Sequence, residues 1–208
     1  MAYSYEDFAR ESGVSRETLD DYRAWHALLL KWNRRINLVS PTALDDFWRR
    51  HALDSWQLTP HIPDNARAFI DLGSGAGFPG LSIAIDCKRR GQGEVLMVEA
   101  AGKKTSFLRT VIRELGLPAR ATSERAEALE PKTYDVISAR AFAPFPRLMS
   151  YAQPFWGENS LGLFLKGESA PAELTEAKKS WSYEVETVPS LSDPTGSVLK
   201  VTGLKQNA

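Results

Sequence analysis

Hydrophobic residues recur every three or four positions through the first third of the chain, the period that places side chains on one face of an α-helix. The clearest such run follows Ser15 and comprises Leu19, Tyr22, Trp25, Leu28 and Leu29. Serines at the start of each helical stretch can accept hydrogen bonds from free N–H groups of the first turn, and they are Ser4, Ser15 and Ser40. We therefore expect residues 1–64 to form a helical extension.

This extension also contains residues that typically begin and end helices. Asp7 stands at the capping-box position after Ser4, and Gly13 is expected to end the helix that they begin. Pro60 and Pro63 close the segment, because proline interrupts both helices and central strands.

From about residue 65 the pattern changes to short apolar runs that alternate with amphipathic stretches. Strands are expected at 67–71, 94–98, 119–122, 134–138, 161–166, 183–188 and 197–204, with helices near 79–87, 103–115, 145–153 and 171–181. This alternation predicts an α/β domain over residues 65–208 with a mostly parallel, doubly wound sheet. The last two strands are joined by the turn at 192–196 without a helix, so they should form an antiparallel hairpin at the edge.

The stretch from Phe69 to Gly80, FIDLGSGAGFPG, joins the first expected strand to the first helix of the sheet region. Gly73, Gly75 and Gly77 alternate within it. Glycine is needed where the backbone takes positive φ or must lie against a ligand with no Cβ between them. A glycine-rich turn at the carboxyl edge of a parallel sheet is the usual place for a nucleotide. We therefore predict a nucleotide-derived cofactor on these glycines.

Two features of this turn favour S-adenosylmethionine over a dinucleotide. The spacing G-x-G-x-x-G from Gly75 to Gly80 matches the dinucleotide pattern, but a pyrophosphate needs free N–H groups where Pro79 has none. Asp71 adds a negative charge just before the turn, where two phosphates would be repelled. A sheet of seven strands ending in a hairpin is also typical of Rossmann-like methyltransferases, whereas a dinucleotide domain usually has six parallel strands. A turn that binds no ligand is the simplest alternative.

Composition and charge limit the compartment and the partners that we expect for this protein. With 208 residues, 43% of them hydrophobic, the chain can bury a sizeable core. Its one cysteine, Cys87, excludes an intrachain disulfide, and no leader or membrane-spanning run is visible, so we expect a cytoplasmic protein. We also expect no membrane partner, no metal and a monomer. Net charge is zero, but residues 88–120 hold eight basic and three acidic side chains, which form either an RNA-binding surface or a solvated helix face.

Two further cofactor contacts are predicted at the ends of the second and third expected strands. Glu99 ends the second strand, where a carboxylate can accept both hydroxyls of an adenosine ribose; an exposed strand-end acid is the alternative. Ala126 and Glu127 follow the third strand, where a backbone N–H and a carboxylate could read the adenine, unless this is a plain exposed loop.

The fourth expected strand continues as ISARAFAP over residues 137–144, and two kinds of chemistry are missing there. Enzymes that methylate an exocyclic amine place Asn or Asp before Pro-Pro-aromatic, and methylation of a pyrimidine carbon needs a thiol nucleophile, whereas Cys87 lies at the end of a helix. Arg140 stands where the proton acceptor would be, and its guanidinium only donates hydrogen bonds. It suits a nucleophile that loses no proton, such as guanine N7. A structural salt bridge is its alternative role.

Three other polar residues are candidates for this site. Lys166 ends the fifth expected strand on the same edge, where a lysine can hold a phosphate. His51 and Asp54 lie one helical turn apart and could form a pair, with Asn37 nearby. A satisfied helix surface is the alternative for that pair.

Seven segments, taken together and in order, resemble the RsmG family, also called glucose-inhibited division protein B. They are NRRINLVS at 33–40, RHALDSW at 50–56, FIDLGSGAGFPGLSIAI at 69–85, VEAAGKKTSFLR at 98–109, ERAEAL at 124–129, ISARAFAP at 137–144 and LFLKG at 163–167. The resemblance implies a bacterial enzyme that transfers a methyl group from S-adenosylmethionine to N7 of a guanine. That guanine would lie in the decoding-region loop of 16S ribosomal RNA, in the small ribosomal subunit.

The resemblance also assigns residues by motif position. It implies cofactor binding by Gly73, Phe78, Ala126, Glu127 and Arg140, and RNA binding or catalysis by Asn37, His51, Arg140 and Lys166. Phe78 stands where the family often has leucine, and either side chain is apolar enough to lie against the adenosine. We expect Arg140, Lys166 and His51 to be the catalytic residues.

Two other functions fit parts of the sequence. The spacing from Gly75 to Gly80 would suit a nicotinamide-dependent reductase. Ala9, Gly13 and Val14 would suit the turn of a DNA-binding helix-turn-helix, although Asp20 and Asp21 would then face phosphates. We interpret the N-terminal helices as a cap over the sheet that shapes an RNA entrance.

Overall fold

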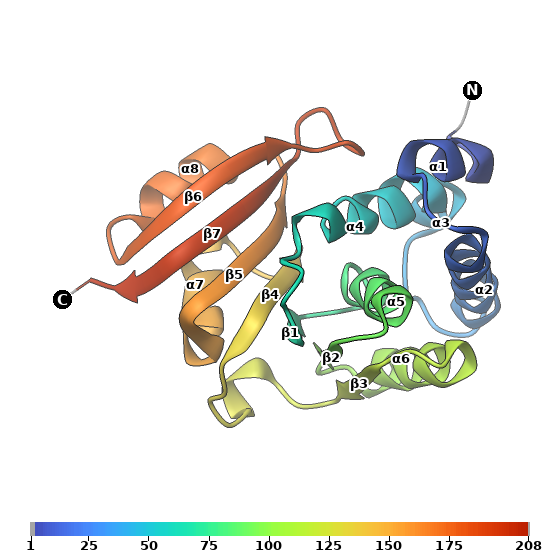
Figure 1. The fold of residues 1–208 in the computed structure, drawn as a ribbon, viewed down its shortest axis with the longest axis horizontal. Coiled ribbons are helices and arrows are strands. Elements are labelled where there is room, and N and C mark those ends of the chain that lie inside the picture. The colour runs from blue at the N-terminus through green and yellow to red at the C-terminus, as the bar shows by residue number, and fades with distance from the viewer. Residues whose placement is uncertain (1–2, 208) are drawn as a thin grey trace.

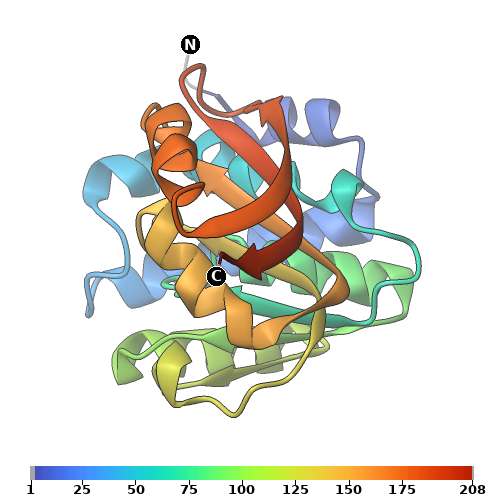
Figure 2. The same ribbon diagram turned by 90° about the vertical axis from the view of Figure 1, so that its left-hand side faces the viewer.

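A seven-stranded sheet forms the centre of the computed structural model, which describes residues 3–207. The order of the strands is β3-β2-β1-β4-β5-β7-β6 (Figure 1). The strands are β1 (Ala68–Leu72), β2 (Glu94–Val98), β3 (Ala119–Thr122), β4 (Tyr134–Arg140), β5 (Trp156–Lys166), β6 (Trp181–Pro189) and β7 (Ser197–Gln206). Strands β1 to β5 are parallel, and β7 runs antiparallel between β5 and β6. The predicted α/β fold and its edge hairpin, which faces the viewer in Figure 2, are confirmed.

Helices cover both faces of the sheet. Those of the α/β region are α5 (Gly80–Arg90), α6 (Gly102–Leu115), α7 (Phe145–Ala152) and α8 (Ala170–Ala177), with short 3-10 turns η3 (Ala126–Ala128) and η4 (Gln153–Phe155). Successive residues of a strand face opposite sides, so Phe69 packs with α5 and α6 whereas Ile70 packs with α7. The largest difference between the expected and the observed strand bounds is at β5, which begins at Trp156 rather than at residue 161. The reason is that Trp156 also pairs with Tyr134 across an irregularity in β4.

The first part of the chain is helical, as predicted. Its elements are α1 (Tyr5–Ser12), α2 (Arg16–Asn33), α3 (Pro41–Asp45), the π-helical turn η1 (Trp48–Leu53), α4 (Asp54–Trp56) and η2 (Thr59–His61). Ser4 and Asp7 form the expected capping box, and Gly13 ends α1 at φ 60°. Helix α2 packs against α5 and α6, so the extension covers the helical layer and not the sheet itself, which corrects the interpretation above. The reason is that α5 and α6 already cover that face of the sheet.

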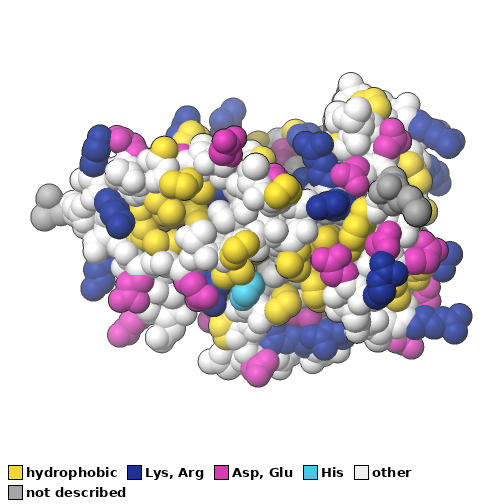
Figure 3. Space-filling model, turned by 90° about the horizontal axis from the view of Figure 1, so that it is seen from above, with side chains coloured by type: hydrophobic (Ala, Val, Ile, Leu, Met, Phe, Trp, Pro, Cys, Tyr) yellow, Lys and Arg dark blue, Asp and Glu magenta, His cyan; other side chains and the backbone are white. Residues whose placement is uncertain are grey.

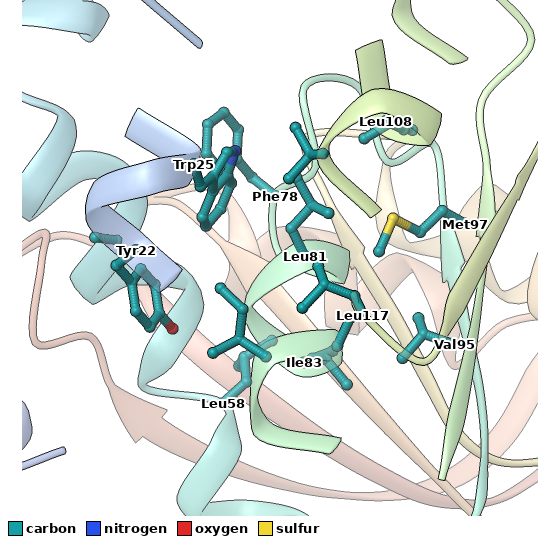
Figure 4. Close-up of a cluster of buried hydrophobic side chains, with 14 of the residues drawn as sticks. Tyr22, Trp25, Leu58, Phe78, Leu81, Ile83, Val95, Met97, Leu108 and Leu117 are labelled. Carbon is teal, nitrogen blue, oxygen red and sulfur yellow. The ribbon is translucent and has the colours of Figure 1, made fainter. Parts of the chain in front are cut away.

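One hydrophobic core continues from the extension into this helical layer (Figure 4). Tyr22 and Trp25 are fully buried, and the Trp25 ring lies 5.0 Å from the ring of Phe78, at the end of the glycine turn. Leu81 and Ile83 extend the contact along α5. The extension therefore packs directly behind the turn that was predicted to bind a nucleotide. Within residues 3–207 no helix is long and apolar enough to cross a bilayer.

Candidate active site

The glycine turn joins β1 to α5, and its glycines have different tasks. Gly73, Gly75 and Gly77 all have positive φ, at 68°, 56° and 97°. A Cβ on Gly73 would clash with the ring of Phe142, whereas a Cβ on Gly75 would meet only the Gly73 carbonyl oxygen at 3.9 Å. Gly75 lines an open cavity, so its missing side chain leaves room for a ligand.

The turn satisfies most of its own N–H groups. Those of Gly77 and Phe78 donate to the carbonyl of Ser74 at 2.7 and 3.1 Å, and that of Leu81 donates to the Gly77 carbonyl at 2.8 Å. The N–H of Gly80 donates to a carboxylate oxygen of Asp71 at 3.1 Å. None of these four groups is left for a pyrophosphate, which is the physical reason to prefer a ligand without phosphates.

Asp71 supports the turn from beneath. It is fully buried, and its second carboxylate oxygen accepts a hydrogen bond from the Ser138 hydroxyl at 2.7 Å. Burial raises its pKa to about 6, against the hydrogen bonds from Ser74, Ser138 and Gly80, which lower it. Asp71 does not line the cavity. The negative charge expected just before the turn is therefore held beneath it, against Gly80 at the start of α5, and not in the wall of the cavity.

The cofactor cavity, as we call the space above the turn, has a volume of about 450 Å³, within the range of small-molecule sites. Seven of the eight residues predicted to bind the cofactor line it, and they are Gly73, Gly75, Phe78, Glu99, Ala126, Glu127 and Arg140. Gly77 does not, because its open side is filled by Leu81. The lining of this cavity suits the predicted S-adenosylmethionine, since the carboxylates of Glu99 and Glu127 can accept hydrogen bonds from ribose hydroxyls and attract the positive charge of the cofactor.

Glu99 has a structural task in addition to the predicted one. Its carboxylate accepts hydrogen bonds from the N–H groups of Gly75 at 2.9 Å and Ala101 at 2.8 Å. It therefore holds the glycine turn against the end of β2. Each carboxylate oxygen can accept a further bond, so a diol remains compatible with this position.

Sequence reasoning missed part of the cavity wall. Leu38 and Val39 of the extension line it, together with Lys104 and Tyr151. The loop that carries Leu38 and Val39 is fixed by Asn33. The side-chain oxygen of Asn33 accepts hydrogen bonds from the N–H groups of Leu38 at 2.8 Å and Val39 at 3.0 Å. The only sequence signal for this contact is the position of Asn33 at the end of a predicted helix. Asn37, four residues on, is exposed.

Arg140 connects the end of β4 to the extension. Its Nη1 donates to Asp54 at 2.7 Å and to the Arg50 carbonyl at 2.8 Å, and its Nη2 lies 2.8 Å from Nδ1 of His51. The guanidinium also lies over the ring of Phe78, 4.9 Å from its centre. His51 and Asp54 therefore both contact Arg140, and no hydrogen bond among the described residues joins them to each other or to Asn37.

His51 is buried behind Arg140 and lines neither the cofactor cavity nor its neighbour. Its ring stacks on Phe78 at 4.1 Å, and because arginine only donates, His51 Nδ1 must accept and Nε2 must carry the proton. Burial and the Arg140 charge lower the pKa of His51 to about 3. The neutral ring is suited to holding Arg140 and unsuited to acting as a base.

A second cavity, of about 490 Å³, adjoins the cofactor cavity, and the two share Arg140, Ala141 and Phe142. Lys166 lines the second cavity, but its ammonium pairs with Glu173 at 2.7 Å and donates to the Ala143 carbonyl at 2.7 Å. Its charge is therefore compensated, and a phosphate would have to compete with Glu173. Ala141 has φ 49°, a conformation that costs energy outside glycine and is often found at functional sites.

Ion pairs neutralise most of the basic excess at 88–120. Five of its cations pair with acids, namely Lys88, Arg89, Arg90, Arg113 and Arg120. Arg109 donates to the Ala121 carbonyl, which leaves Lys103 and Lys104 at the start of α6, beside the cofactor cavity. Another face of the molecule, seen from above in Figure 3, also intersperses basic and acidic side chains. The solvated-face alternative thus describes most of this segment. Across residues 3–207 no group of three His, Cys, Asp or Glu could hold a metal ion.

Two of the solved structures that share this fold are methyltransferases. Geranyl diphosphate methyltransferase in complex with GPP and sinefungin has a TM-score of 0.60 at 11% identity, covering 92% of this chain and 100% of that one. Magnesium protoporphyrin IX methyltransferase from Synechocystis, with bound SAM, has a TM-score of 0.58 at 11% identity, covering 90% and 97%. At these identities the comparison shows the fold alone.

Sequence comparisons are more specific. The family model GidB, described as rRNA small subunit methyltransferase G, matches residues 18–198. The ribosomal RNA small subunit methyltransferase G of Parvibaculum lavamentivorans is 49% identical over 201 residues, 96% of this chain and 89% of that protein. The protein of the same name from Rhodospirillum centenum is 47% identical, over 94% of this chain and 89% of its own length. The chain therefore belongs to the rRNA small subunit methyltransferase G family.

Proposed function

We propose that this chain is an S-adenosylmethionine-dependent methyltransferase that modifies N7 of a guanine in 16S ribosomal RNA. Family membership and the cofactor cavity support the cofactor and the ribosomal RNA substrate. We further propose that it acts in the cytoplasm on the small ribosomal subunit, as a monomer and without a metal. The choice of N7 depends on the chemistry at the end of β4.

The observation that carries the choice of N7 is the placement of Arg140 between the two cavities. Arg140, Ala141 and Phe142 form their shared wall, and none of these side chains can take up a proton. His51 behind them is neutral, with its one acceptor nitrogen engaged by Arg140. Methylation of an amine or a hydroxyl would need a base at this shared wall, and the carboxylates of the two cavities lie outside it, whereas N7 has a free lone pair and loses no proton.

Bound S-adenosylmethionine supplies a methyl group on a sulfonium; the C–N7 bond forms as the C–S bond breaks, and the positive charge passes from sulfur to the base. The protein then has two tasks, which are alignment and exclusion of water. The open space over Gly75 admits the nucleoside, and Glu99 and Glu127 stand where its polar groups would meet carboxylates. Phe142 separates the cofactor cavity from the second cavity, and the centre of its ring lies 5.0 Å from the centre of the Tyr151 ring.

Arg140 retains donors for a ligand. Its described hydrogen bonds involve Nη1 and one contact of Nη2, so Nε and a second Nη2 hydrogen remain. These donors suit a carboxylate, as in the amino-acid end of the cofactor, or a single acceptor such as guanine O6. They cannot engage N7 during transfer, because that lone pair forms the new bond. Arg140 therefore holds a group next to the reacting atom.

The test is to incubate the protein with S-adenosylmethionine labelled in its methyl group and small ribosomal subunits that lack the modification. Digestion of the RNA to nucleosides should place the label in 7-methylguanosine. Label in an exocyclic amine or a ribose would refute the proposed chemistry. The same incubation with Arg140→Ala controls for contaminating enzymes, because that variant should transfer little label.

A further inference from the structure

The second cavity lies where a target base would have to bind. Its shared wall of Arg140, Ala141 and Phe142 faces the cofactor cavity on one side, so a base held there would adjoin the cavity expected to hold the methyl donor. Strand β5, strand β7 and the loop that joins β6 to β7 supply half of the remaining lining residues. The charged side chains of this cavity determine which groups of a base can bind there.

Five charged side chains line the second cavity, and four of them are already paired. Arg140 pairs with Asp54, and Lys166 pairs with Glu173, each at 2.7 Å. The fifth is Asp193, which forms no ion pair within the described part of the chain. A ligand in this cavity therefore meets one carboxylate that is not engaged in an ion pair, although the charge of Arg50 is close enough to lower its pKa.

One oxygen of Asp193 is engaged and the other is free. Oδ1 accepts the N–H and the hydroxyl of Thr195, both at 2.9 Å, whereas Oδ2 accepts no hydrogen bond from residues 3–207. The backbone N–H of Thr195 is the main cause that lowers the pKa of Asp193, so the carboxylate is ionised at neutral pH. Asp193 is exposed, and its free oxygen can accept from a ligand.

The loop that carries Asp193 is held in place by the helical extension. Ser192 donates its hydroxyl to Asp54 at 2.5 Å, and its carbonyl accepts from Nε of Arg49 at 3.0 Å. The N–H of Leu191 donates to the side-chain oxygen of Gln57 at 2.8 Å. Asp54 is also the partner of Arg140, so the same residue fixes both the loop and the guanidinium. Asp193 is thus positioned relative to the shared wall.

We infer that Asp193 is a specificity-determining residue that accepts hydrogen bonds from the N1–H and N2–H groups of the target guanine. The inference rests on the proposed function, since it assumes that the guanine enters the second cavity. The N1 and N2 groups lie on the Watson–Crick edge of guanine, away from N7, so a base read at that edge can turn N7 toward the shared wall. Adenine presents a bare lone pair at N1, which an ionised carboxylate would repel.

The experiment compares guanine with inosine at the target position, because inosine keeps N7 and N1–H but lacks the N2 amino group. Small subunits are assembled on 16S ribosomal RNA in which ligation has placed either nucleotide at that position, and kcat/KM is measured with methyl-labelled S-adenosylmethionine. We expect the unsubstituted protein to prefer guanine by about tenfold or more, the value of one charge-assisted hydrogen bond. In Asp193→Asn the preference should fall to within about twofold.

The variant is chosen to keep the loop. Asparagine retains an oxygen that can accept from Thr195, and it replaces the free carboxylate oxygen with an amide that can only donate. Thr195→Ala is the matched control, because it removes one hydrogen bond of the turn and leaves the carboxylate. We expect Thr195→Ala to keep the preference for guanine.

Each outcome bears on the inference. An unsubstituted protein that methylates inosine and guanine equally would overturn it, and so would an unchanged preference in Asp193→Asn. Equal loss of preference in Thr195→Ala would assign the effect to loop geometry instead. Failure to label guanine at all would reject the proposed function itself, which this design separates from failure of the inference. Calorimetric titration with S-adenosylmethionine shows whether each variant is folded.

Discussion

Protonation of His51 should destabilise the fold, and the structure sets the size of the effect. The ring is 3% exposed, its Nδ1 accepts from Arg140, and its pKa falls from 6.5 to about 3 on folding. A proton on Nδ1 would remove the acceptor and place two cations 2.8 Å apart. The folded protein therefore excludes a proton that the unfolded chain binds below pH 6.5, so stability falls as the pH falls.

The magnitude follows from the two pKa values. Between pH 6.5 and 3 each pH unit costs about 1.4 kcal/mol, so from pH 7.5 to 5 the contribution of His51 falls by about 2 kcal/mol. Asp71 acts in the opposite direction. Its pKa is raised to about 6, so the folded protein binds its proton more tightly and gains stability as the pH falls through 6. The unfolding curve of the protein alone thus mixes two opposing effects.

Comparison with His51→Asn isolates the histidine, because Asp71 is present in both proteins. We expect the variant to be less stable at pH 7.5 and the difference in free energy of unfolding to shrink by about 2 kcal/mol at pH 5. Urea unfolding followed by tryptophan fluorescence measures it. His61→Asn, at a less buried histidine, serves as the control and should show a smaller change. A difference that stays constant from pH 7.5 to 5 would refute the assignment of His51 as a buried neutral acceptor.

Two further predictions concern the cofactor cavity. Arg140→Lys keeps a cation but loses the planar fork that joins Asp54 and His51, so we expect kcat/KM for methyl transfer to fall about 100-fold or more, measured with labelled cofactor, with a modest change in melting temperature. Gly75→Val should abolish heat of binding with S-adenosylmethionine, whereas Gly116→Val, at a similar φ of 59° but remote from the cavity, should suffer the same backbone strain and still bind.

The order of elements could be predicted because it depends on local patterns. Alternation of apolar runs with amphipathic stretches determines a parallel sheet, and the glycine turn follows directly from the sequence around Gly75. The carboxyl ends of parallel strands meet at one edge, so Glu99, Ala126 and Arg140 could be assigned to a single cavity. The same rule places Lys166 at this edge, in the adjoining cavity.

Contacts between distant segments could not be predicted in this way. The pairing of Asp54 with Arg140 joins residues 86 positions apart, and no local period encodes it. The direction of the Asp71 side chain could not be predicted because a strand-end acid can point to either face, and only the register of β1 against β4 places it opposite Ser138. The basic excess at 88–120 was similarly ambiguous, since partners such as Asp21 lie far away in the sequence.

These long-range contacts explain why the helical extension is part of the candidate active site. Its loop at 34–39 supplies Leu38 and Val39 to the cofactor cavity, and its later helices supply Asp54 to the second cavity. Arg140 of β4 contacts Asp54 of the extension directly, and it lies over Phe78, which in turn packs on Trp25 of α2. A guanidinium held on three sides has few rotamers left. In the proposed mechanism, transfer to an atom that needs no base depends on alignment, and the extension would contribute to it by fixing Arg140 before the substrate arrives.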